Sequence, residues 1–532
     1  MIAIKTQSQM RAKSELGAAL HLHEAMDAHR QNKFAEAERA YRAVLAAEPD
    51  HYEALHFLSL VQLQQNKLAE ALDLVSLALK TKPHSTDSLA MHGIVLSNLG
   101  RYSEALEAHD ALLALRPESG ETHYNRGVSL AKLDRHEEAV ASYRQAIAQQ
   151  FRNPTVFHNL GNSLIELGRP QEALDAYDGR PGTAQADADT LINRGNALLE
   201  LKRFEEALDS YDRALVRAQD RTPALVGRGH ALRELNRNDE ALISYDRVLV
   251  LDPANLDALE NKIKVLIALD RHADVQSCCE IALQIAPGNI GIVNTHSVAL
   301  LYLKRPDEAL AAAKTALSLD AKNGAAHFNL GNALYSLGDY EEAEASFRQA
   351  IALAPDVEAA HKNLAGTLLA LEQFDNALSS FDRAVELSPQ SEGTQTNRSL
   401  VYLGLGDFKR GWTEYQHRFK TDQVKCRRDY QAPLWDGGTL NGPLVVWGEQ
   451  GLGDHILYTS MIPDLKERVP SIVLEVPIRL VSLFARSFPD IEVIPLKTTL
   501  YAGPHAAHIP LGTLGLHLRT SWDEFPKTPG GF

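Results

Sequence analysis

Asparagine recurs at one position of a 34-residue period, on segments that have the apolar spacing of a helix. The column contains Asn125, Asn159, Asn193, Asn261, Asn329, Asn363 and Asn397, and three repeats add a second asparagine three residues later, at Asn162, Asn196 and Asn332. An i, i+3 pair lies on one face of a helix. Each carboxamide offers one acceptor and two donors, which match the C=O and N–H groups of an extended peptide backbone. The column is therefore predicted to hold extended or disordered peptide segments of other proteins; the alternative is hydrogen bonding between neighbouring repeats.

A second group of residues that could bind a ligand or do chemistry is the string GEQGLGD at 448–454. Glycines just before a helix leave backbone N–H groups that can meet an anion, so we expect an anion-binding loop made of Gly448, Glu449, Gln450, Gly451 and Gly453. Asp454 is of a residue type that can cap the helix that it opens. The spacing matches neither the dinucleotide motif G-x-G-x-x-G nor a Walker loop, which argues against dehydrogenase and NTPase functions.

Metal and disulfide chemistry are not expected. The three cysteines, Cys278, Cys279 and Cys426, cannot build a disulfide framework. The histidines form no metal-ligand spacing with cysteines or carboxylates. We therefore expect no metal and no cofactor.

The candidate residues must be positioned by an internal repeat. An alanine or a small substitute returns every 34 residues from Ala37 to Gly411, without insertion or deletion. Small residues such as Gly93 stand twelve positions before this anchor, where they let two helices approach closely. Aromatic residues four positions after the anchor supply apolar area, and prolines twelve positions after it end the second helix. Twelve such repeats fill 18–425, preceded by a lead-in or capping helix at 1–17.

The fifth repeat breaks this pattern. Gly179, Pro181 and Gly182 interrupt its second helix. Such breakers predict a shortened helix followed by a loop, with a functional hinge as the alternative. Because the stability of a repeat array depends on the interfaces between neighbouring repeats, this joint is expected to be locally weak.

The period and its columns resemble the tetratricopeptide repeat (TPR), a pair of antiparallel helices. The resemblance implies a mainly α fold, in which stacked repeats form an α-solenoid superhelix with a long concave groove. The asparagine column is also similar to the TPR arm of O-linked N-acetylglucosamine transferases, in which an asparagine ladder holds substrate peptides. The similarity runs from Asn125 to Asn397 and is lost in the first three repeats, where His23, Phe57 and Met91 occupy the column.

Beyond residue 425 the period stops, and glycine-rich turns alternate with β-branched runs. We expect strands at 444–448, 472–476 and 491–495 and helices at about 454–467 and 478–488, which together form a βαβ unit with a parallel sheet. Ligands of such sheets bind at the carboxyl ends of the strands, where the residues of the GEQGLGD string lie.

GEQGLGD resembles the start of the sugar-transferase domain in bacterial TPR-fused glycosyltransferases and, more distantly, the Rossmann-like N-terminal half of heptosyltransferases. In heptosyltransferases an Asp that follows Gly at this turn is a candidate general base toward the acceptor hydroxyl. The resemblance therefore implies a sugar-binding role for the loop and makes Asp454 the candidate general base, with helix capping as its alternative role. The resemblance implies that 426–532 is a small, incomplete Rossmann-like α/β domain of the GT-B type, because a second, donor-binding lobe does not fit into the sequence after the loop. Such a chain would bind a nucleotide-sugar only if the missing lobe were supplied, and its transferase domain is expected to be inactive as it stands.

Charge and hydropathy limit the function further. The chain has 54 Lys and Arg against 69 Asp and Glu, a net charge of 54 − 69 = −15, and no nucleic-acid partner is expected. No apolar run is long enough for a membrane span or a signal peptide, so the protein is expected to be cytoplasmic. The expected function is a scaffold that binds peptide segments; the alternative is a protein glycosyltransferase whose TPR arm presents protein substrates.

Overall fold

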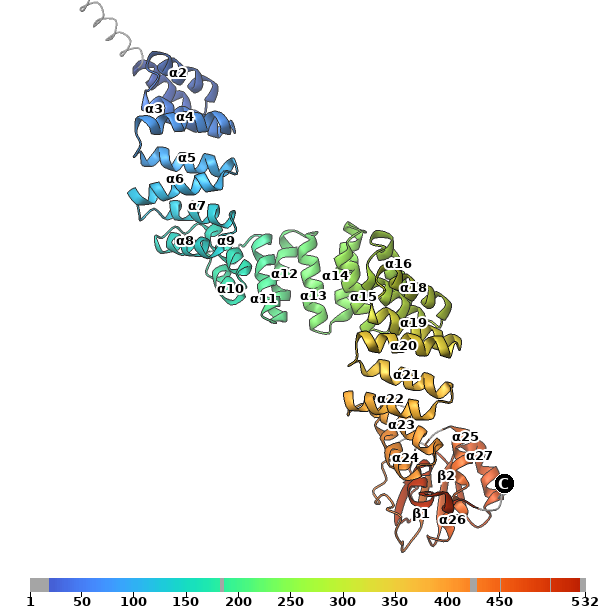
Figure 1. Ribbon diagram of the computed structural model, residues 1–532. Helices are drawn as coiled ribbons and strands as arrows, with labels where there is room; N and C mark the ends of the chain where they lie inside the picture. The colour runs from blue at the N-terminus through green and yellow to red at the C-terminus, as the bar shows by residue number, and fades with distance from the viewer. Residues whose placement is uncertain (1–18, 182–185, 422–427, 450, 498, 527–532) are drawn as a thin grey trace, which may run out of the picture. The chain divides into compact units, whose positions relative to one another are not determined.

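The computed structural model of the chain describes residues 19–181, 186–421, 428–449, 451–497 and 499–526 (Figure 1). The lead-in helix expected at 1–17 lies outside these residues, as do Gln450 and Cys426. The described residues form two compact units, which divide between Val265 and Leu266. None of the helices formed by the described residues is both long enough and apolar enough to cross a lipid bilayer.

The first unit consists of antiparallel helix pairs joined by short turns. A helical segment at 19–30 is followed by α2 (Phe34–Ala47), α3 (Tyr52–Gln64), α4 (Leu68–Thr81), α5 (Thr86–Asn98), α6 (Tyr102–Leu115), α7 (Gly120–Ala131), α8 (His136–Ala148), α9 (Pro154–Glu166), α10 (Pro170–Asp178), α11 (Ala188–Glu200), α12 (Phe204–Arg217), α13 (Thr222–Glu234), α14 (Asn238–Leu251) and α15 (Leu256–Ala268), which crosses the division. Helix α3 has 13 residues and α4 has 14. The turns beside them complete the predicted 34-residue period.

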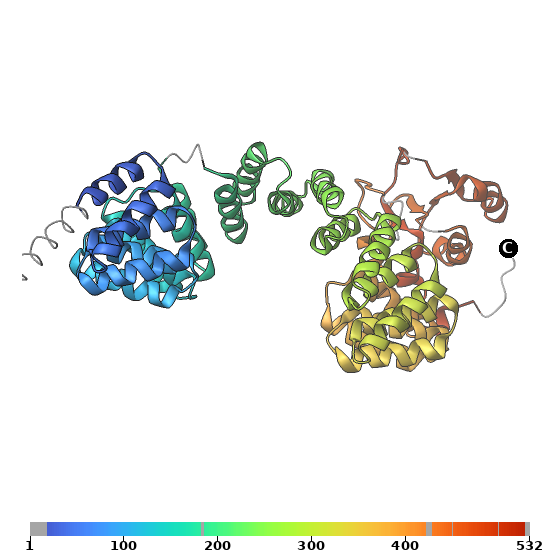
Figure 2. The same ribbon diagram turned by 90° about the horizontal axis from the view of Figure 1, so that it is seen from above.

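The second unit continues the same pairing and ends in a sheet. Its helices are α16 (His272–Ile285), α17 (Ile290–Tyr302), α18 (Pro306–Leu319), α19 (Gly324–Leu337), α20 (Tyr340–Leu353), α21 (Glu358–Ala370), α22 (Phe374–Leu387), α23 (Glu392–Gly404) and α24 (Phe408–Tyr415), followed by the 3-10 turn η2 (Gln416–Lys420). Successive helices pack side by side, as Figures 1 and 2 show. The described repeats are thus arranged as the sequence period predicts.

A residue in the left-handed region follows the first helix of every repeat. Positive φ angles occur at Asn32, Asn66, Gly100, Asp134, Gly168, Lys202, Asn236, Asp270, Lys304, Gly338, Glu372 and Gly406. This conformation ends a helix and satisfies its last carbonyl groups. It lets the chain reverse within a few residues, so the second helix of each repeat can pack against the first.

Close packing inside a repeat depends on a glycine that faces an aromatic ring. A Cβ atom at Gly127, Gly161, Gly195, Gly229 or Gly331 would lie 2.3–2.7 Å from ring atoms of Tyr143, Tyr177, Tyr211, Tyr245 or Phe347, respectively. All five rings are buried. The small column and the aromatic column predicted from the sequence therefore contact each other, one pair in each of these repeats.

The fifth repeat has the predicted short second helix. Helix α10 has 9 residues and ends at Asp178, whereas its counterpart α12 in the next repeat has 14. Gly179 follows directly as the C-cap. The shortened helix is confirmed, and the functional hinge stays a hypothesis.

A four-stranded parallel sheet follows the repeats, in the order β3-β2-β1-β4. Its elements are β1 (Leu444–Trp447), α25 (Leu452–Thr459), α26 (Ile462–Lys466), β2 (Ile472–Val476), α27 (Ile478–Ser487), β3 (Glu492–Pro495), β4 (Ala507–Pro510), η3 (Leu511–Thr513), α28 (Gly515–Leu518) and η4 (Trp522–Glu524). The three predicted strands and their parallel pairing are confirmed. The fourth strand was not predicted, because its four residues lack the β-branched run that marks the other strands.

The helix predicted at about 454–467 is wrong in its bounds. It begins two residues earlier, at Leu452, and it is divided into α25 and α26. The hydroxyl groups of Thr459 and Ser460 donate hydrogen bonds to backbone carbonyls of the preceding turn, and Pro463 has no N–H to continue the helix. Both features end a helix or interrupt it.

The core of the sheet is shared with the last repeat. Phe408, Trp412 and Tyr415 on α24 are buried in the same cluster as strand residues such as Leu444. The indole Nε1 of Trp412 also donates to the carbonyl oxygen of Arg519 at 2.8 Å. The last helix of the array is therefore part of the core of the α/β region.

Candidate functional site

The predicted asparagines differ in how far their side chains can reach a ligand. Asn196 is exposed, and a half-buried group comprises Asn125, Asn159, Asn162, Asn193, Asn332, Asn363 and Asn397. Asn261 and Asn329 are only 5% and 4% exposed. These two side chains are the least accessible members of the column.

Several carboxamides bond to each other across the repeat interface. Asn193 Nδ2 donates to Asn162 Oδ1 at 2.8 Å, and Asn363 Nδ2 donates to Asn332 Oδ1 at 2.7 Å. Asn162 Oδ1 also accepts from the hydroxyl of Tyr177 at 2.8 Å. These bonds are the inter-repeat contacts of the alternative interpretation. They use one donor of the first asparagine and one acceptor of the second, so each pair keeps further polar atoms for a ligand.

The two enclosed asparagines are held within the array. Asn261 Oδ1 accepts from Arg233 Nη1 at 2.9 Å, and its Nδ2 donates to the Asp257 side chain at 2.8 Å. Asn329 Nδ2 donates to the backbone carbonyl of Asn294 at 3.3 Å. Asp257 lies one turn before Asn261 on the same helix, whereas Arg233 and Asn294 lie on helices of the preceding repeats, so these bonds are contacts within the array.

Three of the half-buried asparagines meet at a hollow of about 260 Å³ on the first helices of repeats ten to twelve. Asn332 on α19, Asn363 on α21 and Asn397 on α23 line it together with Tyr335, Lys362, Gly366 and the rings of Phe347 and Phe381. The Asn397 carboxamide has no hydrogen-bond partner among the described residues. We call this site the amide hollow.

The amide hollow exists because one repeat lacks a side chain. The column eleven positions before the anchor carries a side chain in every other repeat, for example Asn332 in repeat ten and Leu400 in repeat twelve, but Gly366 in repeat eleven. A Cβ atom at Gly366 would meet nothing within 4 Å. The space above Gly366 is therefore open, whereas the space above the glycines that face aromatic rings is filled by those rings.

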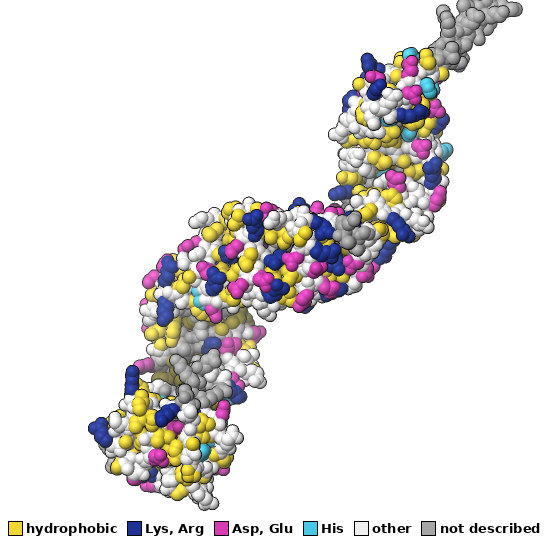
Figure 3. Space-filling view, turned by 180° about the vertical axis from the view of Figure 1, so that it is seen from behind, with side chains coloured by type: hydrophobic (Ala, Val, Ile, Leu, Met, Phe, Trp, Pro, Cys, Tyr) yellow, Lys and Arg dark blue, Asp and Glu magenta, His cyan; other side chains and the backbone are white. Residues whose placement is uncertain are grey.

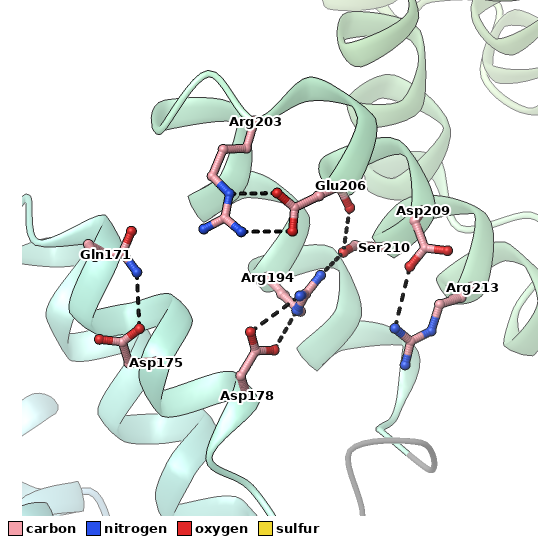
Figure 4. Close-up of polar contacts among 9 residues, drawn as sticks. All are labelled: Gln171, Asp175, Asp178, Arg194, Arg203, Glu206, Asp209, Ser210 and Arg213. Carbon is pink, nitrogen blue, oxygen red and sulfur yellow. Dashed lines mark hydrogen bonds and ion pairs between the residues drawn. The ribbon is translucent and has the colours of Figure 1, made fainter.

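A basic residue directly after the asparagine column was missed by the sequence analysis. In α11, Arg194 Nε pairs with Asp178 Oδ1 of the preceding repeat at 2.7 Å, and its Nη1 donates to Ser210 Oγ of its own repeat at 2.6 Å (Figure 4). Arg126 and Arg228 make the same two kinds of contact. The signal is in the sequence: each arginine has an aspartate 16 residues before it and a serine 16 residues after it.

The glycine-rich loop after β1 is tied to its surroundings. The backbone N–H of Gly448 donates to the Glu475 carbonyl at 2.9 Å, and a Cβ atom on Gly448 would lie 1.9 Å from Nε2 of His455. Gly451 and Gly453 are exposed. His455, which the sequence analysis did not single out, therefore fills the space inside the loop.

The predicted base, Asp454, caps its helix. Its Oδ2 accepts from the backbone N–H of Gly451 at 3.1 Å, and Gly451 is the N-cap residue of α25. The capping role given as the alternative is thus present, at the third position of the helix rather than at the N-cap. A catalytic role for Asp454 stays a prediction.

Glu449 in this loop forms a buried ion pair with the end of the repeat array. Its Oε1 lies 2.6 Å from Nη2 of Arg418, and both side chains are almost completely buried. Arg418 also donates to Thr513 Oγ1 at 2.9 Å. Burial raises the pKa of the Glu449 carboxyl, and the Arg418 charge opposes this effect. Glu449 thus joins the loop to η2, and a ligand-binding role for it stays a prediction.

A larger cavity of about 690 Å³ lies at the carboxyl ends of β1 and β4. Trp447 and Pro510, the last residues of these strands, line it together with Phe419, Arg428 and Trp435. None of the described residues of the 448–454 string is among its lining residues. The cavity is therefore beside the predicted loop and was not expected from the sequence.

Charges of both signs are interspersed over the face of the molecule in Figure 3. Many of them belong to ion pairs such as Arg203–Glu206, in which Nε and Oε1 are 2.7 Å apart (Figure 4). Among the residues that the structure describes, no cluster of His, Cys, Asp or Glu could hold a metal ion. Candidate chemistry is thus concentrated in the amide hollow and in the α/β region.

Comparisons with known proteins identify the repeats. Family profiles of the tetratricopeptide repeat match residues 22–86, 90–154, 295–358 and 332–392, and two further profiles of the same repeat match 188–220 and 222–255. Protein FlbA of Caulobacter vibrioides is 36% identical over 104 residues, which are 18% of this chain and only 17% of FlbA.

Several solved structures are similar to parts of the chain. The C-terminal part of a TPR repeat-containing protein from Cytophaga hutchinsonii is 15% identical, with a TM-score of 0.40 over 45% of this chain and 99% of that one. The APC/C hetero-tetramer Cut9–Hcn1 is 14% identical, with a TM-score of 0.36 over 79% and 96%. YrrB, described as a TPR protein with an unusual peptide-binding site, is 22% identical, with a TM-score of 0.31 over 35% and 96%. Over the segments that the family profiles match, the chain consists of tetratricopeptide repeats.

Proposed function

We propose that the repeat array, over 18–425, is a protein-interaction scaffold that binds an extended peptide segment of another protein along the first helices of repeats ten to twelve. The observation that carries this proposal is the amide hollow, where Asn332, Asn363 and Asn397 from three successive repeats share one cavity. A carboxamide can exchange both kinds of hydrogen bond with a peptide backbone. Three carboxamides in a row match a backbone that continues from one repeat to the next.

The bond between Asn363 and Asn332 supports this role. It fixes the orientation of both carboxamides before a ligand arrives, which reduces the conformational entropy that binding would otherwise lose. Asn363 Oδ1 is left to accept and Asn332 Nδ2 is left to donate. Asn397 is half-buried and offers all of its polar atoms.

The affinity expected from these groups is moderate. One exchanged hydrogen bond contributes about 0.5–1.5 kcal/mol net, so three contribute about 1.5–4.5 kcal/mol. The rest of the binding energy must come from side chains of the partner and from its contact with exposed apolar residues such as Tyr335. A single asparagine is therefore not sufficient to hold a segment.

The test uses peptides selected by the full chain from a displayed library of random dodecapeptides. Replacing Asn332, Asn363 and Asn397 together by Ala should lower the affinity for the selected peptides by about 10-fold to 1,000-fold. Asn376→Ala on α22, an exposed asparagine outside the hollow, is the matched control and should leave affinity unchanged. Equal affinity of the triple variant and the chain with native residues, at equal helicity, would refute peptide binding at this site.

A second candidate function concerns the α/β region, which we propose to be a domain of glycosyltransferase type over 426–532. Two observations favour it: the parallel order β3-β2-β1-β4, and the cavity of about 690 Å³ at the carboxyl ends of β1 and β4. Parallel sheets bind ligands at this edge, where the strand order reverses. In this proposal the array presents protein substrates, and Asp454 is the general base on the loop beside the cavity, whose lining does not include it.

Calorimetry with nucleotide-sugars and a sugar-transfer assay on a peptide selected by the array test the second candidate. Transfer that is lost in Asp454→Asn but retained in Asp523→Asn, at an exposed position on η4, would establish it. If neither heat of binding nor transfer appears at millimolar donor, the region has no transferase function on its own, and the scaffold remains the function of the chain.

A further inference from the structure

We infer that the amide hollow takes an acidic side chain of the bound segment, glutamate in first place. This inference rests on the proposed function, because it assigns chemistry to one residue of the peptide that the array binds. The subsite exists in repeat eleven because residue 366 is a glycine, whose missing side chain leaves the space open. The argument depends on the shape of the hollow, its charge and its polar wall.

The open space above Gly366 fits one side chain, beneath a backbone that the carboxamides bind. Gly366 leaves open space in the middle of α21, between Asn332 on one side and Asn397 on the other. A backbone that bonds to the asparagines of repeats ten and twelve passes over this space. The side chain of the peptide residue that faces Gly366 can therefore enter the cavity.

The single charged side chain that lines the hollow is a cation, Lys362 on α21. It forms a long ion pair with Glu358, in which Nζ and Oε2 are 3.8 Å apart, and the other oxygen of Glu358 accepts hydrogen bonds from Ser391 and Thr394. Lys362 is 37% exposed and keeps donors for a second anion. A carboxylate in the hollow would thus become a second anionic partner of Lys362.

The polar wall distinguishes an acidic side chain from an apolar one. The remaining N–H groups of Asn332 and Asn397 are donors that a carboxylate satisfies. An apolar side chain would displace water from these amides without replacing its hydrogen bonds, which is unfavourable. The buried rings of Phe347 and Phe381 lie beneath, where they can pack against the CH₂ groups of a glutamate. Glutamate reaches this floor better than aspartate because its stem is one CH₂ longer.

Gly366→Leu is the decisive variant, because it fills the hollow without removing a polar group. A Cβ atom at this position meets no neighbour, and leucine is a better helix former than glycine, so the fold should be retained. Gly404→Leu is the matched control: Gly404 is also helical and also has no neighbours for a Cβ atom, but it is exposed, whereas Gly366 is half-buried, and it does not line the hollow. Lys362→Gln removes the charge and keeps a polar side chain of similar length.

The experiment selects random dodecapeptides on the full chain and on each variant. On the chain with native residues and on Gly404→Leu, we expect glutamate or aspartate to be enriched at one position. On Gly366→Leu the enrichment should disappear, and peptides from the first selection should bind about 10-fold more weakly or worse. Those peptides should bind to Lys362→Gln with about 5-fold lower affinity, the ratio expected for the loss of one partly exposed ion pair.

Two outcomes would overturn the inference while leaving the proposed function intact. One is an apolar residue, or no preferred residue, at every position of peptides whose binding depends on Asn363. The other is an acidic preference that survives in Gly366→Leu. If no peptide is selected, or if binding does not depend on the asparagines, the proposed function itself fails and the inference fails with it.

Discussion

Arg418 and Glu449 join the end of the repeat array to the loop after β1 by an ion pair that is almost completely shielded from water. Their nearest atoms, Nη2 and Oε1, are 2.6 Å apart. Removing one partner of such a pair leaves an uncompensated buried charge. We expect Glu449→Ala to lower the free energy of unfolding of the C-terminal region by about 3–5 kcal/mol.

Urea unfolding followed by tryptophan fluorescence measures this loss, because Trp412, Trp435 and Trp447 lie in the same region. Arg348→Ala, which breaks the partly exposed pair with Glu344 on α20, should change the same quantity by less than about 1 kcal/mol. Similar losses for the two variants would show that burial does not determine the strength of the Arg418–Glu449 contact.

A pair of glycine-to-alanine substitutions should have opposite effects on stability. In Gly127→Ala the new Cβ atom would lie 2.6 Å from the Tyr143 ring, and such overpacking costs about 1–3 kcal/mol. In Gly366→Ala it meets nothing, so the higher helix propensity of alanine should stabilise the chain by about 0.5–1 kcal/mol. Thermal unfolding of both variants gives the comparison. Equal effects would contradict the packing described for the two glycines.

His109 should make the third repeat sensitive to acid. It replaces the usual aromatic ring beside Gly93, it is 1% exposed, and burial lowers its pKa from 6.5 to about 4. The unfolded chain binds this proton at a higher pH than the folded chain. The contribution of His109 to stability is therefore complete above about pH 6.5 and is lost as the pH falls through about 4, with a total of about 3 kcal/mol.

His109→Tyr restores the residue found at the equivalent position in repeat four, Tyr143, and should remove this part of the pH dependence. The measurement is the difference in free energy of unfolding between the variant and the chain with native residues at pH 7 and at pH 4.5. His84→Tyr, at an exposed position, is the control. A difference that does not change with pH would show that His109 does not couple folding to protonation.

Arg194→Ala should loosen the contact between repeats five and six. Arg194 connects α10, α11 and α12 through Asp178 and Ser210 (Figure 4). Helix α10 is short, so fewer apolar contacts can compensate for the loss of this bridge. We expect faster amide hydrogen exchange in α10 and α11 but not in α14. A uniform change along the first unit, or none, would rule out a local role for the arginine.

The repeat made most of the fold predictable from one sequence. Twelve copies of the same pattern show which positions need small or aromatic residues, and the structure confirms that Gly127 and Tyr143 meet. The strands at 444–448 and 472–476 were predictable for a different reason, since their apolar β-branched runs leave few alternatives.

The features that could not be predicted depend on contacts between residues far apart in sequence. The bond between Asn363 and Asn332 requires the spacing of neighbouring helices, which the period alone does not give. The cavity at Trp447 needs β4, a strand of four residues with a weak sequence signal. The amide hollow was not predicted because it results from the missing side chain at Gly366. The prediction of the binding site used only the asparagines that recur along the column.

The shared core of α24 and the sheet limits how the chain can be divided for experiments. Phe408, Trp412 and Tyr415 are covered by residues of the α/β region, so a fragment that stops after α24 would present three aromatic side chains to water. A fragment that starts after α24 would lose the same rings from its interior. Expression of the two parts as separate soluble proteins therefore needs a cut before α24, which would leave the second helix of the twelfth repeat with the sheet.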